Sequence, residues 1–415
     1  MTKLGKYSFG IGDRFGRQGE AQLRAIAKAA EDGIEITPVW NKSHREHTAV
    51  KTHPADVRSE ADTAVKSRGW KGPYLVDADH INMDNAEQFI DSSDFFTLDV
   101  ADFIGRPAGG GEIEAFVKKH ADLAGDLEID GIGKPLEIGA ERIASIAGKY
   151  LLAVRQAGRI YRLIRTKKGP GSFFVEVSMD ETDQPQTPVE MLFILAAIAD
   201  EQIPADTVAP KFSGRFNKGV DYVGDVSLFA AEFEQDLAVI AFSVKKFGLP
   251  AGLKLSVHSG SDKFAIYPAI NAAMKKFGAG AHIKTAGTTW LEEVTGLAMA
   301  GGDGLETAKS IYTEAIGRFD ELTAPYATVI DIDRSKLPSA VEIERYDGER
   351  FAAAVRHDRS CESYNPHLRQ LLHVAYKVAA EMGQTYTSAL ERHAGIIGVN
   401  VTQNLYERHI KPIFG

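Results

Sequence analysis

Cysteine is nearly absent from this 415-residue chain, and that scarcity excludes two classes of site at once. Cys361 is the only cysteine, so neither a disulfide framework nor a multi-cysteine zinc site can form. A chain without disulfides is typical of the cytoplasm, where thiols stay reduced. The first residues also lack the apolar core of a signal peptide. We therefore expect a cytoplasmic protein.

Long apolar runs and an excess of positive charge are missing too. The longest uninterrupted apolar run, Met191–Ala199, has nine residues and is too short to cross a bilayer. The chain has 48 Lys and Arg against 57 Asp and Glu, a net charge of −9, which provides no basic field for nucleic-acid phosphates. No G-x-G-x-x-G fingerprint follows the first predicted strand, and no H-E-x-x-H zinc-protease helix occurs. We expect a small-molecule partner rather than a membrane or a nucleic acid.

Short apolar or β-branched segments recur along the chain, and each of them runs into polar residues. There are eight: Tyr7–Gly10, Ile36–Trp40, Pro73–Val76, Phe95–Leu98, Phe173–Val177, Val208–Phe212, Leu253–Val257 and His282–Thr285. Helical patterns fill most gaps, over Glu20–Asp32, Asp56–Ser67, Val189–Glu201, Asp225–Phe247 and Ala265–Phe277. This alternation predicts an α/β protein with a closed (β/α)₈ TIM barrel. An open doubly wound sheet would give a similar pattern.

Two stretches depart from the alternation of strands and helices. The gap after the fourth predicted strand, Ile104–Gly171, is oversized, and we interpret it as an insertion or lid over the barrel. From Asp303 to Gly415 the sequence is mostly helical. We therefore predict that residues 1–302 form the barrel, and that residues 303–415 form a helical C-terminal extension packed on it.

In a (β/α)₈ barrel, the residues just after the strands meet on one face, and active sites are built there. In this chain those positions are dense in carboxylate, imidazole and ammonium groups. They are Asp13, Arg14, Asn41, Glu46, Asp77, Asp79, His80, Asp99, Asp180, Glu181, Lys211, His258, Ser259, Asp262, Lys263, His282 and Lys284. Three histidines with a carboxylate are the ligand types that Zn²⁺, Mn²⁺, Ni²⁺ or Co²⁺ prefers.

Each candidate also has a purely structural interpretation. His80 fits a loop histidine capped by its neighbouring aspartates, and His282 fits a satisfied core histidine. Glu46 and Asp79 are candidates for paired acid/base work, yet a single carboxylate more often lies on a solvated surface. His258 has the stronger functional pattern, because it ends a buried strand and enters a loop of small residues that lets backbone approach a ligand.

The last predicted strand supplies a second type of candidate. His282 and Lys284 are two residues apart in that strand, so both side chains should face the same side. Thr289 and Glu292 fit a capping box, which would place free amides near Gly287 and Thr288 and let them hold a carboxylate or phosphate. Lysines at strand ends could bind the same groups, and these are Lys211, Lys263 and Lys284.

Several of these segments together resemble the tagaturonate epimerase family. They include Ser8-Phe-Gly-Ile-Gly-Asp-Arg-Phe-Gly, Asp77-Ala-Asp-His, Lys218-Gly-Val-Asp-Tyr-Val-Gly-Asp, Leu255-Ser-Val-His-Ser-Gly-Ser-Asp-Lys-Phe and His282-Ile-Lys-Thr-Ala-Gly-Thr. The resemblance spans nearly the whole chain, in order. It implies a barrel enzyme that uses a divalent metal (Zn, Mn, Ni or Co) and interconverts keto-sugar acids differing at one hydroxyl-bearing carbon.

The resemblance also implies roles for single residues. Glu46 and Asp79 would be the acid/base pair, and His80, His258 and His282 would bind the metal. Asp180 is the preferred carboxylate ligand, with Glu176 and Glu181 as alternatives. The expected substrate-binding residues are Asp13, Arg14, Lys211, Ser259, Asp262, Lys263, Lys284, Gly287 and Thr288.

Other functions remain open at the level of sequence. An inward-facing lysine would suit an aldolase that forms a Schiff base without a metal, and a barrel that binds sugar acids without converting them would carry similar residues. For the epimerase, retro-aldol cleavage and re-closure competes with proton exchange. The sequence is also compatible with a homo-oligomer.

Overall fold

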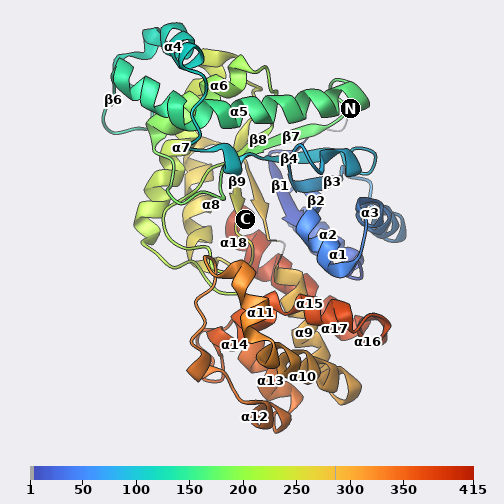
Figure 1. Ribbon diagram of the computed structural model, residues 1–415. Coiled ribbons are helices and arrows are strands. Elements are labelled where there is room, and N and C mark those ends of the chain that lie inside the picture. The colour runs from blue at the N-terminus through green and yellow to red at the C-terminus, as the bar shows by residue number, and fades with distance from the viewer. Residues whose placement is uncertain (1–3, 286) are drawn as a thin grey trace.

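The computed structural model describes residues 4–285 and 287–415, and its eight predicted strands close into one parallel barrel (Figure 1). In chain order these strands are β1 (Tyr7–Ile11), β2 (Ile36–Ser43), β3 (Leu75–Ile81), β4 (Phe95–Asp99), β7 (Phe174–Ser178), β8 (Thr207–Ala209), β9 (Lys254–His258) and β10 (Ala281–Lys284). Each strand pairs with the next one, and β10 pairs with β1. The (β/α)₈ prediction is confirmed, and the open doubly wound sheet is excluded.

The helices predicted around the barrel are also present, and local signals fix their ends. They are α1 (Gly19–Glu31), α3 (Pro54–Arg68), α6 (Pro188–Asp200), α7 (Val226–Phe247) and α8 (Tyr267–Phe277). Asp225 caps the start of α7 with its side chain. Gly248 ends the same helix at a φ of 70°, a conformation that glycine adopts without steric cost. No helix in the described parts of the chain is both long and apolar enough to span a membrane.

The stretch predicted as an insertion contains a barrel helix. Helix α5 (Ala140–Lys168) packs against β4 and α6, so it connects the fourth and fifth barrel strands as a barrel helix should. The additional material before α5 is helix α4 (Gly110–Lys119) and a hairpin of β5 (Gly125–Leu127) and β6 (Leu136–Ile138), which the sequence patterns did not predict. The inserted part is therefore limited to residues 104–139.

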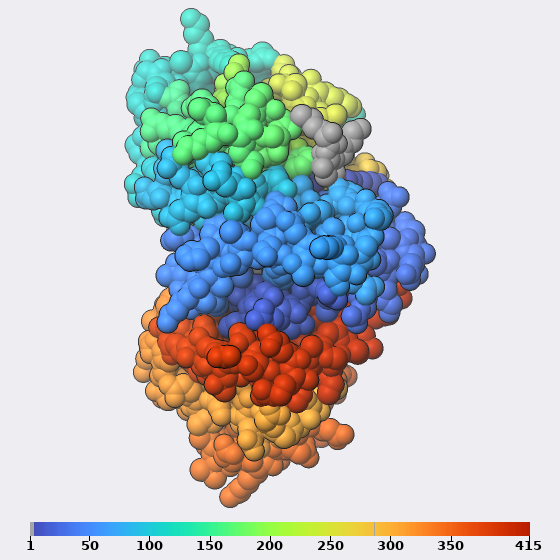
Figure 2. All heavy atoms as spheres, turned by 90° about the vertical axis from the view of Figure 1, so that its right-hand side faces the viewer, coloured from blue at the N-terminus to red at the C-terminus, as the bar shows by residue number. Residues whose placement is uncertain are grey.

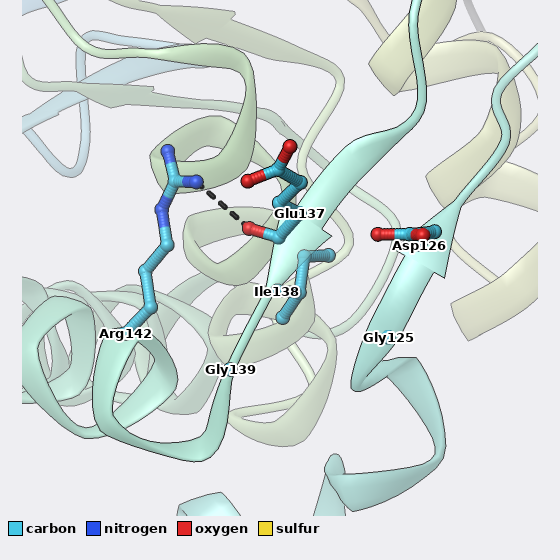
Figure 3. Close-up of a pocket in the computed structure, with 6 residues that line it drawn as sticks. All are labelled: Gly125, Asp126, Glu137, Ile138, Gly139 and Arg142. Carbon is cyan, nitrogen blue, oxygen red and sulfur yellow. Dashed lines mark hydrogen bonds between the residues drawn. The ribbon is translucent and has the colours of Figure 1, made fainter.

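Helix α4 and the hairpin do not cover the face where the strands end. His120 lies 2.9 Å from Asp200, the last residue of α6, and Asp122 binds Lys246 near the end of α7. These helix ends lead into the next strands, so they lie at the opposite end of the barrel. The lid interpretation is corrected accordingly. A surface pocket formed by the hairpin and Arg142 at the start of α5 (Figure 3) belongs to this remote region and contains none of the candidate residues.

The C-terminal region is helical, as predicted, and it begins with α9 (Thr288–Ala300). The following helices are α10 (Gly302–Gly317), α11 (Phe319–Thr323), α12 (Ala340–Glu344), α13 (Gly348–Val355), α14 (Pro366–Val374), α15 (Tyr376–Glu381), α16 (Gln384–Arg392) and α17 (Ala394–Gln403). Residues 288–298 of α9 are all buried, because α10, α13 and α17 surround this helix. Helix α9 is thus the core of the C-terminal region rather than an outer helix of the barrel.

The last residues of the chain take the place that α9 leaves free. The π-helix η7 (Asn404–Ile410) packs on α1, and α18 (Lys411–Phe414) packs on α8. Phe414 lies 5.0 Å from the ring of Tyr7 and 6.2 Å from that of Phe9, both in β1. Figure 2 shows the red C-terminal segment directly against the blue N-terminal one. The predicted division at residues 302 and 303 is therefore corrected: residues 404–414 complete the barrel wall.

Candidate active site

The carboxyl end of β3 has an irregular backbone that aims two candidate side chains. The pairing of β3 with β4 shifts register between Ala78 and Ile81, and such an irregularity redirects side chains. His80 has a φ of 54°, a left-handed conformation that is rare for residues other than glycine. Backbone strain of this kind, worth about 1–3 kcal/mol, clusters at active sites. It places His80 and Asp79 beside the ends of the neighbouring strands.

His80, Asp180 and His258 form a compact group of potential metal ligands. One ligand atom from each residue lies within 4.8 Å of the others. His258 Nδ1 lies 3.0 Å from Asp180 Oδ2, and His80 Nε2 lies 3.5 Å from Asp180 Oδ1. His258 Nδ1 is buried, yet it has no hydrogen bond of acceptable geometry among the described residues. Two imidazoles, a carboxylate and an unsatisfied ring nitrogen fit a divalent metal such as Zn²⁺, Mn²⁺, Ni²⁺ or Co²⁺.

Carboxylates behind the two histidines hold the imidazole rings in place. Glu176 Oε1 lies 2.7 Å from His258 Nε2, and Asp79 Oδ1 lies 2.9 Å from His80 Nδ1. Metal-binding histidines usually have a carboxylate or carbonyl at the other ring nitrogen. Among the three carboxylates considered from the sequence, this geometry favours Asp180 as the ligand and gives Glu176 an orienting role. Glu181 instead lies in a second potential group with His80 and Asp99.

Lys284 is surrounded by carboxylates at the centre of the barrel. Its Nζ lies 2.8 Å from Asp77, 2.9 Å from Asp79 and 3.0 Å from Glu176. Burial lowers the pKa of this ammonium, but the three carboxylates outweigh burial and hold the pKa of Lys284 well above its ordinary value. A Schiff-base lysine must be neutral to attack a carbonyl. Lys284 therefore does not fit the metal-free aldolase alternative. Its ammonium group already contacts three carboxylates of the protein.

Glu46 and Arg14 form the second part of the site. Glu46 lies in the first turn of α2 (His44–Val50) and completes a capping box with Ser43. Its Oε1 accepts from Arg14 Nε at 3.0 Å, and the Arg14 guanidinium lies 4.1 Å from the ring centre of Tyr376 in α15. Burial raises the pKa of Glu46, but the charge of Arg14 outweighs it and holds the pKa below its ordinary value. Glu46 is therefore an ionised carboxylate that can accept a proton.

His282 lies one layer deeper in the barrel than the ligand group. Its Nδ1 lies 2.9 Å from Ser8 Oγ, and its ring packs on Phe95 at 5.3 Å. Both His282 and Lys284 face the barrel interior, as the two-residue spacing predicted. His282 nevertheless belongs to neither potential metal group found among the described residues. Its predicted role as a ligand is not supported by its position, and we return to it below as an experimental comparison.

Three more predicted substrate-binding residues have structural partners. The Asp13 carboxylate accepts hydrogen bonds from the amides of Phe15, Gly16 and Arg17, at 3.0, 2.9 and 2.8 Å, so it shapes the loop that carries Arg14. Ser259 Oγ donates to the carbonyl of Lys284 at 2.6 Å. Lys263 Nζ donates to Ser261 Oγ at 3.0 Å and to the carbonyl of Asp262 at 3.1 Å. Lys211 is half-buried at the end of β8, and among the described groups its ammonium has no ion pair.

Asp262 joins the barrel to the C-terminal helices instead of facing the ligand group. It is fully buried and binds Arg369 at 2.7 Å, His357 at 3.2 Å and Thr288 Oγ1 at 2.8 Å. His409 of η7 lies 3.3 Å away. These contacts attach α14 and η7 to the loop after β9, while the substrate-binding roles of Asp262 and Thr288 stay predictions.

Glycine is required at position 287 because His373 of the C-terminal region packs directly against its backbone. A Cβ built on Gly287 would lie 2.0 Å from His373 Nε2 and 2.5 Å from the carbonyl oxygen of Gly260, so only glycine fits there. The predicted capping box is not formed. Helix α9 begins at Thr288 without a side-chain cap, and Glu292 accepts from Asn404.

Asp262→Asn is expected to lower the free energy of unfolding by about 3 kcal/mol, because it leaves the buried Arg369 without its counter-charge. Urea denaturation followed by circular dichroism measures the change. Asp303→Asn is the matched control, since Asp303 also binds an arginine and a histidine, Arg392 and His393, but on the surface. Exposed pairs contribute little, so this variant should resemble the unchanged protein. Equal stability of the two variants would contradict the role given to Asp262.

The strand-end rule missed residues that reach the site from farther along the chain. Lys218 lies in the loop between β8 and α7, and Arg45 in α2 binds Glu181 at 2.7 Å. His373 and Tyr376 enter from the C-terminal helices. Lys218 left a signal in the sequence, as the first residue of one of the segments that resembled the family.

Comparison with known proteins agrees with the resemblance. A family model described as tagaturonate epimerase matches residues 1–394. The chain belongs to the tagaturonate epimerase family. The tagaturonate/fructuronate epimerase of Thermotoga maritima is 28% identical over 423 residues, which cover 98% of this chain and 81% of that protein.

Solved structures agree with the fold of this tagaturonate epimerase family member. The fructuronate-tagaturonate epimerase of Cohnella laeviribosi, crystallised with one glycerol, superimposes with a TM-score of 0.80 at 22% identity. The alignment covers 98% of this chain and 81% of that one. A second structure of that protein, with two glycerols, gives a TM-score of 0.81 at 22% identity over 99% of this chain and 82% of the other.

Proposed function

We propose that this protein is an epimerase that interconverts keto-sugar acids of the tagaturonate and fructuronate type. Membership of the family, over residues 1–394, carries the proposal. The site supports it, because an ionised carboxylate, Glu46, and a potential metal group, His80, Asp180 and His258, share the strand-end face. These groups suit a substrate that has both a ketone and ionisable hydroxyls.

We further propose that His80, Asp180 and His258 hold a divalent metal ion. When bound, such an ion supplies positive charge that stabilises negative charge developing on a ketone oxygen. Asp79 was expected to share the acid/base work with Glu46. Its carboxylate lies 2.9 Å from His80 Nδ1 and 2.9 Å from Lys284 Nζ, so both neighbours hold it behind the imidazole ring. We therefore assign Asp79 the task of orienting His80.

The proposed reaction needs one carboxylate that takes and returns a proton. Glu46 takes the proton from the hydroxyl on the carbon to be inverted. The oxygen's electrons form a carbonyl as the bond to the next carbon breaks, and the electrons of that bond pass to the ketone as an enolate. The new aldehyde turns over, the bond re-forms on its other face, and Glu46 returns the proton to the oxygen. Arg14 keeps Glu46 ionised and in place.

Conversion of tagaturonate by the purified protein tests the activity directly. We expect fructuronate to appear, resolved by anion-exchange chromatography, and chelator-treated protein to regain activity with at least one of Zn²⁺, Mn²⁺, Ni²⁺ and Co²⁺. Binding of tagaturonate without any conversion would instead indicate a sugar-acid-binding barrel. Full activity after complete removal of metal would contradict the metal proposal but not the epimerase.

Deuterium at the inverted carbon distinguishes the two mechanisms. Cleavage and re-closure keeps the hydrogen on that carbon throughout, so the label is expected to remain in the product, as measured by mass spectrometry. Proton exchange removes that hydrogen, so loss of the label to solvent during turnover would rule out the retro-aldol route.

A further inference from the structure

The cations at the strand-end face differ in whether a carboxylate neutralises them. Lys284 contacts three carboxylates, Arg45 binds Glu181, and Arg369 binds Asp262. Lys211 and Lys263 have no carboxylate within 4.0 Å in the described ranges, 4–285 and 287–415, and neither has Lys218. A half-buried ammonium without a counter-charge is costly for the free protein, so its presence at the catalytic face calls for an anionic ligand.

Lys218 lies next to the other parts of the site. Its Nζ would be 3.5 Å from a Cβ built on Gly260, two residues after His258. The charged groups that act on it most strongly are Arg14, Glu181, Glu46 and Arg45. Burial and the neighbouring Arg14 guanidinium lower the pKa of the Lys218 ammonium. An anion bound here would therefore lie beside the loop that follows His258.

The loop that carries Lys218 is fixed before any ligand binds. The Lys218 amide donates to the carbonyl of Val329 at 2.8 Å, and the next amide, of Gly219, donates to Ser261 Oγ at 3.0 Å. Gly219 has a φ of 77°, and a Cβ built on it would lie 3.1 Å from His373 Cβ. Contacts from Val329, from the loop after β9 and from α14 thus hold the backbone on both sides, which reduces the entropy lost when the side chain binds a ligand.

Arg14 offers a second donor at the same place. Its Nε binds Glu46 and its Nη1 donates to the carbonyl of His373 at 3.5 Å. Nη2 has no hydrogen bond to any other described group. Two of the three lysines suggested from the sequence are less suitable, since Lys284 is neutralised and Lys263 is bound to Ser261 and Asp262.

We propose that Lys218, with Arg14, binds the carboxylate of the sugar acid and thereby selects acids over neutral ketoses. This inference rests on the proposed function, because it names the part of that substrate which this site recognises. The charge of the ligand is then matched to the charge of the site: one ammonium and one guanidinium nitrogen face one carboxylate. Lys284, Arg45 and Arg369 are already paired with the protein's own carboxylates.

Lys218→Met tests the inference with two ligands, tagaturonate and the ketohexose in which CH₂OH replaces its carboxylate. Isothermal titration calorimetry on the metal-loaded full chain gives Kd for each ligand, and initial rates give kcat and KM. We expect Kd and KM for tagaturonate to rise about 50-fold, the effect of one charge-assisted hydrogen bond. Weak binding of the ketohexose should not change. Lys245→Met, which removes an exposed, unpaired ammonium from α7, is the control.

The outcomes separate this inference from the proposed function. A protein that binds tagaturonate through Lys218 without converting it would overturn the epimerase proposal and leave the inference standing. The inference is wrong if Lys218→Met binds tagaturonate as tightly as the unchanged protein does. It is also wrong if Kd rises by the same factor for tagaturonate and for the ketohexose. The variant should unfold at an unchanged or higher temperature, because the ammonium it removes has no counter-charge. A large drop would identify a structural role instead.

Discussion

Glu46→Gln is expected to lower kcat for tagaturonate about 1,000-fold, within the range typical for loss of general acid/base catalysis. Glutamine keeps the size of the side chain, but its NH₂ group cannot accept a hydrogen bond as the Glu46 oxygens do from Arg14 and Ser43, and it cannot take a proton from a hydroxyl. The potential metal ligands do not include Glu46, so metal content should stay unchanged. Initial rates, together with metal analysis of the same preparation, measure both quantities.

The control for this variant must account for the capping box that Glu46 completes at the start of α2. Glu342→Gln makes the same change in the capping box of α12, where Glu342 binds Ser339 on the surface. Similar small effects of the two changes on stability, with activity lost only in Glu46→Gln, would support the catalytic role. A Glu46→Gln enzyme that keeps more than about one tenth of its kcat would exclude Glu46 as the essential base.

The sequence was sufficient to predict the barrel because the signals for its strands are local. Each strand is a short buried run followed by polar residues, and four of the five predicted outer helices end near a glycine such as Gly69 or Gly278. Eight alternating units of strand and helix are compatible with few folds other than a closed parallel barrel. The strand-end rule then placed Asp79, His80, Asp180 and His258 on one face, where the structure brings them together.

Other features depend on contacts between residues distant in the chain, and local patterns carry no trace of them. The exchange of α9 for residues 404–414 in the barrel wall rests on contacts such as Phe414 with Tyr7. The position of the insertion rests on the pair Asp122–Lys246. A periodic pattern shows that a segment has an apolar face, but not which surface covers it.

The same limit applies to single residues of the site. A two-residue repeat shows that His282 and Lys284 face inward, yet the depth of each in the barrel depends on how all eight strands are staggered. Asp262 follows β9 like a catalytic residue, but its partners Arg369 and His409 come from the far end of the chain. Lys218 was missed because its loop folds back over the site well after β8 has ended.

His258→Gln and His282→Gln together decide which histidines hold the metal. We expect His258→Gln to reduce the affinity for Zn²⁺ or Mn²⁺ at least about 100-fold, because an amide replaces an imidazole ligand and even outer-shell changes cost 10- to 100-fold. Activity should fall with it at limiting metal. His282→Gln should keep full metal content. Equilibrium dialysis followed by elemental analysis measures the stoichiometry, and circular dichroism confirms that both variants are folded.

His282 is a suitable comparison because it is also a histidine that faces the barrel interior. Unlike His258, it is part of neither potential metal group among the described residues. Burial lowers the pKa of His282 to about 3, so the ring is neutral and its replacement removes no charge. A glutamine amide can donate or accept, so it can still form the hydrogen bond with Ser8 Oγ. If His282→Gln lost the metal and His258→Gln kept it, the ligand set would be the one that includes His282, and the deeper layer of the barrel would have to open toward the strand ends. If both variants kept the metal, the second group, His80 with Asp99 and Glu181, would be the binding site.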